Sequence, residues 1–435
     1  MKLTVFQAAK GDCLLLEGAD GRRMLVDGGM PLAYTAHVAP ALSALRGPNG
    51  DGRIDLVYVS HIDQDHIGGI LRLLDDVVAW RVHDHHLAAG NASHAAPHVL
   101  RPPEIDGIWH NAFHEQVGDN AGPIGRMLAA SASILAGAEE NVALTAAVRA
   151  GELATSVSEA IRVSRRIGPG QLGIRLNFEF GGGLAYLRDG LPSLSLGGMR
   201  LFVLGPTAHY LRELREEWNA WLGEHQEALE RIARSARRAQ RDLDASALDA
   251  TIALTLTQAK ELGNIKNVTP PNLASLMFLV EEAGRTILLT GDGHARHILG
   301  GLRRQGRLDD DVGIHVNVLK VQHHGSENNI DRAFCRKVTA DEYVFCGNGE
   351  HDNPDLDVIG TIADSRLGPA SVRSPNPAAA GPFRFSFSSR STVTEKAAAK
   401  VHMTKVETLV DQLVASSAAR LSARFLEKSS FEFPV

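Results

Sequence analysis

One short segment of the chain concentrates side chains that bind metal ions. His61, Asp63, Asp65 and His66 lie close together, directly after the apolar run Ile54–Ser60. Imidazole nitrogens and carboxylate oxygens are common protein ligands of Zn²⁺ and Mn²⁺. In an extended loop the side chains of His61 and Asp63 project to the same side, whereas Asp65 and His66 turn with the start of the next helix. The segment therefore predicts a loop that serves two adjacent metal ions.

Two later segments carry further metal-binding residue types, and each follows a predicted strand. Asp292 comes after the apolar run that ends at Thr290, and a carboxylate at a strand end suits the bridging of two cations. His323 and His324 precede Gly325 after the run Ile314–Val321. A histidine at this place completes the second metal site, and either of the two suits that role.

Composition limits the class of protein. The chain has 435 residues, of which 44% are hydrophobic, and this is enough to bury a substantial core. A net charge of −6 argues against a protein that coats nucleic acid electrostatically. Three cysteines without a C-x-x-C pair indicate reduced thiols. No apolar run is long enough to span a membrane and no secretory signal is evident, so we expect a cytoplasmic protein without membrane contact.

The elements that position these residues alternate between strands and helices. We expect strands at 3–7, 13–17, 23–26, 54–60, 77–82, 105–109, 173–180, 199–204, 275–281, 286–290, 314–321, 342–346 and 383–389. Helices are predicted near 36–46, 67–74, 294–304 and 402–427. Two helical insertions, at about 117–168 and 207–262, interrupt the pattern. This predicts an α/β domain over 1–365, followed by a linker, strand and C-terminal helix over 366–435.

The segment Ser60–Gly69 resembles the H-x-[HD]-x-D-H signature of the metallo-β-lactamase fold, and its aspartate variant resembles the soluble domain of ComEC-type DNA-uptake proteins. Five other segments are similar to that group in the same order: Gly11-Asp12, Asp27-Gly28-Gly29, Asn272–Ser275, Leu289–Asp292 and Lys320–Ser326. The similar segments span about half of the chain. The resemblance implies an αββα sandwich that carries the two helical insertions and the C-terminal extension.

The resemblance also implies a ligand set for two divalent metal ions, Zn²⁺ or Mn²⁺. His61 and Asp63 would hold the first ion, Asp65, His66 and His324 the second, and Asp292 would bridge them. His323 would contact the substrate or support a ligand. Asp63 stands where many family members have histidine, which favours harder cations such as Mn²⁺. The third histidine of the first site is absent from Pro270–Leu273, and His110 is a substitute that we consider, although a structural role for it is favoured.

The expected activity is hydrolysis by a hydroxide bound between the two metal ions, with Asp65, Asp292 and His351 as catalytic residues. We favour a phosphodiesterase or nuclease with a nucleic acid or nucleotide substrate. The alternatives are hydrolysis of a lactone, thioester or amide, and a partner-controlled effector or scaffold. The insertions are expected beside the site, where they would restrict access or bind a protein partner. Charged residues over 230–244 favour a solvated helix face over a phosphate-binding one.

Overall fold

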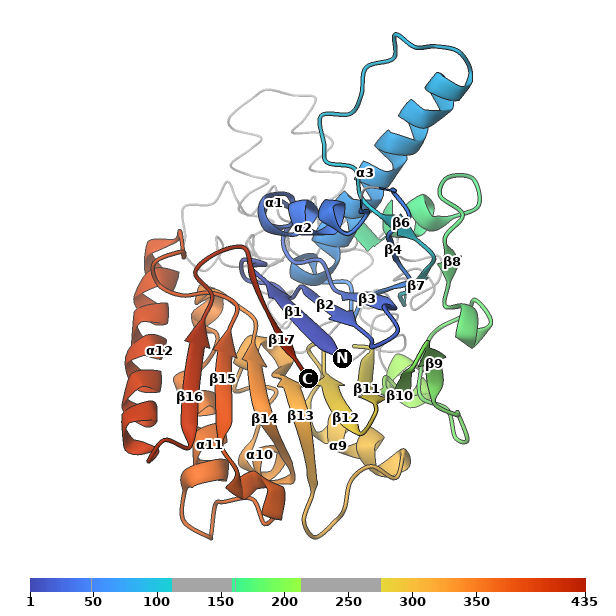
Figure 1. Cartoon of the computed structure of the whole chain (residues 1–435). Helices are drawn as coiled ribbons and strands as arrows, with labels where there is room; N and C mark the ends of the chain where they lie inside the picture. The colour runs from blue at the N-terminus through green and yellow to red at the C-terminus, as the bar shows by residue number, and fades with distance from the viewer. Residues whose placement is uncertain (48, 112–158, 161, 213–274) are drawn as a thin grey trace, which may run out of the picture.

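The computed structural model describes residues 1–47, 49–111, 159–160, 162–212 and 275–435. In these ranges the chain is a mixed α/β protein built around two large sheets, with helices packed against them (Figure 1). The predicted insertions at 117–168 and 207–262 lie mostly outside the described residues, as does the charged stretch 230–244.

The first sheet combines the N-terminal strands with the last strand of the chain. Its strands run in the spatial order β17 (Ser430–Pro434), β1 (Lys2–Phe6), β2 (Leu14–Glu17), β3 (Arg23–Val26), β5 (Leu56–Tyr58), β7 (Gly107–Trp109) and β8 (Arg175–Leu176). Pairing is antiparallel from β17 to β3 and parallel from β3 to β8. Two short strands, β4 (Arg53–Ile54) and β6 (Glu104–Ile105), pair beside it.

The second sheet is formed by the C-terminal half of the described chain. Its strands run in the order β16 (Leu421–Phe425), β15 (Phe383–Phe387), β14 (Val338–Phe345), β13 (Ile314–Lys320), β12 (Arg285–Leu289), β11 (Met277–Glu282), β10 (Met199–Gly205) and β9 (Leu194–Leu196). Pairing is parallel from β16 to β12 and antiparallel from β12 to β9. Strands from the segment 366–435 therefore extend both sheets.

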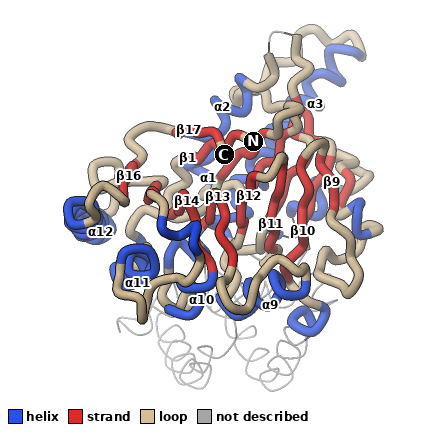
Figure 2. The backbone as a smooth tube through the Cα atoms, turned by 60° about the horizontal axis from the view of Figure 1, so that its bottom comes forward, coloured by secondary structure: helices blue, strands red, loops and turns tan. Residues whose placement is uncertain are grey.

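The buried apolar side chains fall into three clusters that follow this layering. One cluster joins the two sheets, with Leu14 and Tyr58 from the first and Phe278 and Val318 from the second. Another lies between the first sheet and the helices α1 (Pro31–Ala33), α2 (Ala39–Ala44) and α3 (Gln64–Ala88). The third lies between the second sheet and α9 (Ala295–Arg304), α10 (Arg332–Lys337), α11 (Leu356–Leu367) and α12 (Ala397–Ser416), which Figure 2 shows against that sheet.

The parallel strands determine where polar loops gather. Strands β3 and β5 of the first sheet end at Val26 and Tyr58, directly before Asp27 and the loop of His61. Strands β12 and β13 of the second sheet end directly before the segments that hold Asp292 and His324. Because parallel neighbours end at the same edge, each sheet brings its polar loops together there.

The structure differs from the predicted elements in several places. Residues 77–82 are not a strand, because α3 continues to Ala88; Leu74 and Val77 of that helix are buried, and a short apolar segment suits a buried helix face as well as a strand. The C-terminal helix stops at Ser416, and 421–425 form β16 instead. Strand β17 was not anticipated, since its register depends on pairing with β1, far away in the sequence. Among the described helices none has the length and apolar character needed to cross a membrane.

Candidate metal centre

Four strand-end loops and one turn meet where the two sheets face each other. The loops follow β3, β5, β12 and β13, and the turn between β1 and β2 adds Asp12. Backbone contacts tie the loops of the two sheets together: the Leu276 amide donates to the Ser60 carbonyl at 2.8 Å, and the Tyr58 hydroxyl donates to the Leu276 carbonyl. The ends of both sheets are therefore held at one place.

Asp292 is the centre of the cluster. The Nε2 atoms of four histidines lie within 3.7 Å of its carboxylate: His66 at 3.4 Å, His61 at 3.6 Å, and His323 and His324 at 3.7 Å. Only 3% of Asp292 is exposed. Burial opposes its ionisation, but the positive charges of the surrounding imidazoles outweigh burial and hold the pKa of Asp292 well below its usual value. The anionic form of this carboxylate is the form the site stabilises.

Two of these histidines are held by an aspartate at the opposite ring nitrogen. His66 Nδ1 lies 2.9 Å from Asp27 Oδ2, and His324 Nδ1 lies 3.1 Å from Asp12 Oδ1. Such carboxylate–histidine pairs fix the orientation of the ring and leave Nε2 to bind a cation. Burial lowers the pKa of His324, but Asp292 and Asp12 outweigh it and raise that pKa to about 9.

Lys320 compensates the charge of Asp12. Its ammonium forms a buried ion pair with Asp12, lies 3.8 Å from Asp292, and donates to the Gly291 carbonyl at 3.1 Å. Burial opposes the ammonium charge, but the two carboxylates raise the pKa of Lys320 above its usual value. The lysine therefore stabilises the excess of carboxylates, although it is itself no metal ligand.

The remaining aspartates of the predicted loop lie at the edge of the cluster. Asp63 Oδ2 is 3.5 Å from His61 Nε2, and its side chain is 29% exposed. Asp65 Oδ2 is 3.2 Å from His324 Nε2. Burial opposes ionisation of Asp65, but its hydrogen bond with His324 and the charges of His66 and His324 lower the pKa of Asp65. Both carboxylates therefore face the histidines that the sequence assigned to the same metal sites.

His323 differs from His324 in both contacts and exposure. Its Nδ1 contacts Asn329 Oδ1 at 2.5 Å, and its side chain is 27% exposed, against 7% for His324. Asn329 also donates to the Asp292 carbonyl at 2.8 Å. Both histidines have positive φ values, 47° and 55°, a strained conformation that often marks functional positions. The structure therefore brings both rings to Asp292, with His323 on the more open side.

The polar atoms of the cluster fit a bound cation. Two groups have ligand atoms that all lie within 4.8 Å of one another: Asp12 with His66 and His324, and His61 with His66 and Asp292. Three buried atoms of the cluster, His61 Nε2, His66 Nε2 and Asp292 Oδ1, have no hydrogen-bond partner among the described residues. Buried polar atoms are costly without a partner, and divalent cations would satisfy all three. Because His66 Nδ1 contacts Asp27, Nε2 is the His66 nitrogen that is available to a cation.

Close backbone contact explains the glycine at position 69, three residues after His66. The Gly28 amide donates to the His66 carbonyl and the Gly69 amide to the Gly29 carbonyl, both at 2.8 Å. A Cβ at Gly69 would lie 1.9 Å from the Gly28 oxygen. The missing side chains thus allow the first turns of α3 to lie directly on the loop that carries Asp27.

Two histidines considered from the sequence, His351 and His110, are not part of this cluster in the described residues, and neither is His294. His351 is exposed in the short turn Glu350–Asp352. His110 is buried after β7, where its amide donates to Asn177 Oδ1. His294 caps α9. In contrast, Asp12, Asp27, Lys320 and Asn329 belong to the cluster, but the sequence analysis assigned them no role. For three of them, position within a segment similar to the ComEC-type group was the available signal.

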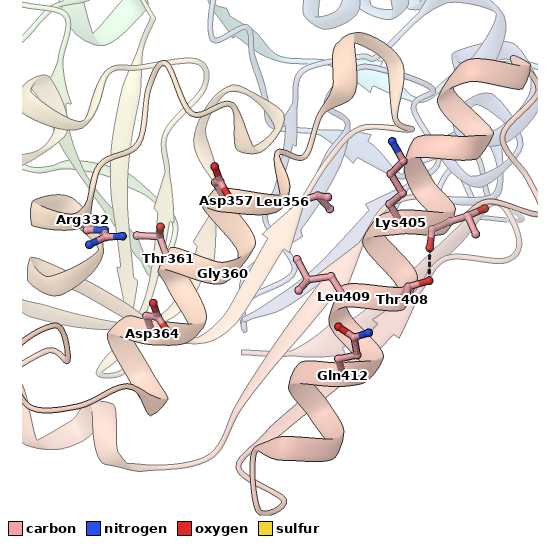
Figure 3. A pocket seen from close by; sticks show the side chains of 11 residues that line it. Arg332, Leu356, Asp357, Gly360, Thr361, Asp364, Lys405, Thr408, Leu409 and Gln412 are labelled. Carbon is pink, nitrogen blue, oxygen red and sulfur yellow. Dashed lines mark hydrogen bonds between the residues drawn. The ribbon is translucent and has the colours of Figure 1, made fainter.

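A separate groove lies on the helical side of the second sheet. It has a volume of about 810 Å³ and is lined by residues of α10, α11 and α12, including Asp357, Asp364 and Lys405 (Figure 3). None of its lining residues belongs to the histidine–aspartate cluster. The groove is therefore not the entrance of the candidate metal centre.

No family model matches the chain, and no curated protein is significantly similar to it.

Proposed function

We propose that this protein is a metal-dependent hydrolase that cleaves phosphodiester bonds, with a metallo-β-lactamase-like αββα arrangement of its sheets and helices. One observation carries the proposal: four imidazole Nε2 atoms surround the buried carboxylate of Asp292, and several of these polar atoms have no hydrogen-bond partner among the described residues. The likeness of the six segments to the ComEC-type group supports the same conclusion.

In this proposal the ligands keep the assignment made from the sequence. His61 and Asp63 would hold one divalent cation, Asp65, His66 and His324 would hold the other, and Asp292 would contribute to both. Two such cations would lower the pKa of a water molecule and neutralise the charge that develops on the substrate. Zn²⁺ and Mn²⁺ both suit this mixed set of nitrogen and oxygen ligands.

The protein's own residues orient the ligands and hold protons. Asp27 and Asp12 keep the rings of His66 and His324 with Nε2 toward Asp292. Asn329 accepts the proton of His323 Nδ1, which leaves His323 Nε2 toward the site on its more exposed side. We propose that His323 contacts a substrate oxygen, and that Lys320 limits the repulsion between Asp12 and Asp292. His351 as a catalytic residue stays a prediction.

A phosphodiester substrate follows from the donor set. Aspartates make up three of the six proposed ligands (Asp63, Asp65 and Asp292), and carboxylate ligands favour hard cations that bind phosphate oxygens. A nucleic acid or nucleotide is the corresponding substrate class. A protein partner bound through the insertions is also a proposal, since those segments lie mostly outside the described residues.

The test compares substrates under one metal condition. The protein is stripped with a chelator, reloaded with Mn²⁺ or Zn²⁺, and incubated with single- and double-stranded DNA, RNA, cyclic nucleotides, a phosphodiester chromogen and an ester chromogen. We expect cleavage of at least one phosphodiester, loss of it in Asp292→Asn, and retention in Asp364→Asn, an acidic residue of the separate groove. Hydrolysis of the ester chromogen alone would contradict the proposal and favour a hydrolase that acts on a lactone, thioester or amide.

A further inference from the structure

Three histidines converge at the far end of α3. His83 and His86 lie on the last turns of this helix, and His94 lies on the segment that follows it. His83 is 17 positions after His66, so at 1.5 Å per residue the two are about 25 Å apart along the helix. Figure 1 shows this end of α3 extending away from the two sheets. The group is thus separate from the candidate metal centre.

The spacing between two of these rings suits a shared cation. His83 Nδ1 and His94 Nδ1 lie 3.3 Å apart. Two imidazole nitrogens bound at about 2.0–2.1 Å to one tetrahedral Zn²⁺ are separated by about 3.3–3.4 Å. His83 is only 8% exposed and His94 is partly buried, so water is largely excluded on the His83 side of the pair. The separation therefore matches two ligands of one ion.

His86 supplies a third imidazole beside this pair. Its ring stacks on that of His94, with centroids 4.1 Å apart and planes 11° from parallel. His83 and His86 are three residues apart, and this spacing places them on the same face of a helix. The His86 carbonyl accepts from the Asn91 amide, and the Asn91 carbonyl accepts from the His94 amide. Through these two backbone hydrogen bonds the chain turns back after the helix, and His94 lies against the end of α3.

Other contacts hold the same segment in place independently of the histidines. Trp80 Nε1 donates to the Val99 carbonyl at 3.1 Å, and the Arg101 guanidinium lies over the Trp80 ring. Arg101 also pairs with Asp84, so its positive charge is compensated next to the three histidines. The imidazoles are therefore brought together by a preformed scaffold, which lowers the entropic cost of binding a ligand.

We propose that His83 and His94, with His86 as the third ligand after rotation of its side chain, bind a divalent cation that prefers imidazole nitrogen: Zn²⁺, Ni²⁺ or Cu²⁺. The site fastens the segment after α3 to the helix and takes no part in hydrolysis. It does not depend on the proposed function, because none of its ligands belongs to the cluster around Asp292.

The test counts bound metal. Wild-type protein and the double variant His83→Gln/His94→Gln are stripped with a chelator, titrated with ZnCl₂, and analysed for metal after removal of excess ion. We expect the double variant to bind one equivalent fewer than wild type. The matched control is His85→Gln/His98→Gln, which changes two exposed histidines of the same region and should keep the wild-type stoichiometry.

A second measurement separates this site from the centre at Asp292. In the background His66→Ala/Asp292→Asn we expect one equivalent of Cu²⁺ to remain, with an electron paramagnetic resonance signal split by two or three imidazole nitrogens. Adding His83→Gln/His94→Gln to that background should abolish the signal. Two results would overturn the proposal: the same amount of bound metal per protein with and without His83 and His94, or a Cu²⁺ signal without nitrogen splitting. Either result would mean that His83 and His94 are only hydrogen-bonded to each other.

Discussion

At the scale of single residues, the site depends on which nitrogen of each histidine is free. His66 and His324 use Nδ1 to contact Asp27 and Asp12, so both present Nε2 to Asp292. The ligands are therefore set by aspartates that bind no metal in our assignment. Residues outside the ligand set should thus influence metal binding as well as the ligands themselves.

Replacement of Asp27 by asparagine tests this dependence. Asp27 Oδ1 accepts from the Ser60 amide, so the new amide nitrogen would take the place of Oδ2 and face His66 Nδ1. This reverses the tautomer and puts a proton on Nε2. We expect the affinity for Zn²⁺ to fall about 10- to 100-fold, as measured by competition with a chromogenic chelator. Asp55→Asn, at the other end of β5, is the control and should bind metal like wild type.

Asp63 and Asp65 should respond differently to substitution. Asp65→Asn removes a carboxylate that contacts His324, and we expect activity to fall by several orders of magnitude while the fold is retained. Asp63→His adds a nitrogen ligand at a partly exposed position and should shift metal preference from Mn²⁺ toward Zn²⁺ with some activity left. Elemental analysis of bound metal and measurement of hydrolysis rates for both variants test these two expectations. Wild-type activity in Asp65→Asn would contradict the proposed mechanism.

The raised pKa of His324 predicts how the metal-free protein responds to pH. Its pKa is raised from 6.5 to about 9 in the fold, so the folded chain binds this proton more tightly than the unfolded chain. The resulting stabilisation is complete below pH 6.5 and is lost as the pH rises through about 9. We expect the Tm of chelator-treated protein to decrease over this interval. A cation must displace the same proton, so metal affinity should rise over the interval.

The variant His324→Gln is the control for this pH dependence. It should flatten the decrease of Tm between pH 6.5 and 9, whereas His315→Gln, which pairs with Asp341 away from the cluster, should leave it unchanged. An unchanged slope in His324→Gln would show that another group is responsible.

At the scale of elements, the position of α3 determines the position of His66. The helix begins at Gln64, so Asp65 and His66 lie in its first turn, and its first turns lie on the backbone of Gly28 and Gly29. This contact requires glycine, since a Cβ at Gly69 would lie 1.9 Å from a carbonyl oxygen. Helix α3 thus fixes the loop after β5, which carries His61, against the loop after β3, which carries Asp27.

Paired glycine substitutions test the close contact. Gly69→Ala should lower the free energy of unfolding by about 1–3 kcal/mol and weaken metal binding, because α3 must move away from Gly28. Gly300→Ala, inside α9, meets nothing within 4 Å and should raise the free energy of unfolding by about 0.5–1 kcal/mol. Denaturant titrations of both variants provide the values. A stabilised Gly69→Ala would contradict the contact.

At the scale of the whole molecule, the C-terminal segment joins both sheets. Strand β16 extends the second sheet, and β17 then crosses to pair with β1 of the first. Arg424 of β16 pairs with Glu342 and lies over the rings of Phe431 and Phe433 of β17. The last residues therefore cover the edge of β1, which would otherwise expose unpaired backbone groups.

Deletion of residues 428–435 should reveal this covering role. Removal of β17 leaves β1 as an edge strand and removes the partners of Arg424. We expect a lower Tm and concentration-dependent association, measured by thermal unfolding and size-exclusion chromatography. Glu432→Gln, which removes only an exposed ion pair with Lys2, should behave like wild type. A monomer of unchanged Tm after the deletion would contradict this role.

The sequence by itself determined the local features of this protein. The strand at 23–26 was predicted with the bounds that the structure has, and 314–320 with one residue more, because short apolar runs bounded by turn residues have few alternatives. The ligand-type residues at 61–66, 292 and 323–324 were found because they follow such runs directly. Their chemistry is a property of residue type and spacing, which a linear sequence contains.

Only the tertiary structure decided how these residues combine. The pairing of Asp27 with His66 and of Asp12 with His324 depends on which loops meet, and β17 depends on an edge more than 420 positions away. The error at 77–82 has the same origin, since a short apolar segment becomes helix or strand according to what packs against it. Contacts between distant segments are set by the packing of the two sheets, and this packing leaves no local pattern in the sequence.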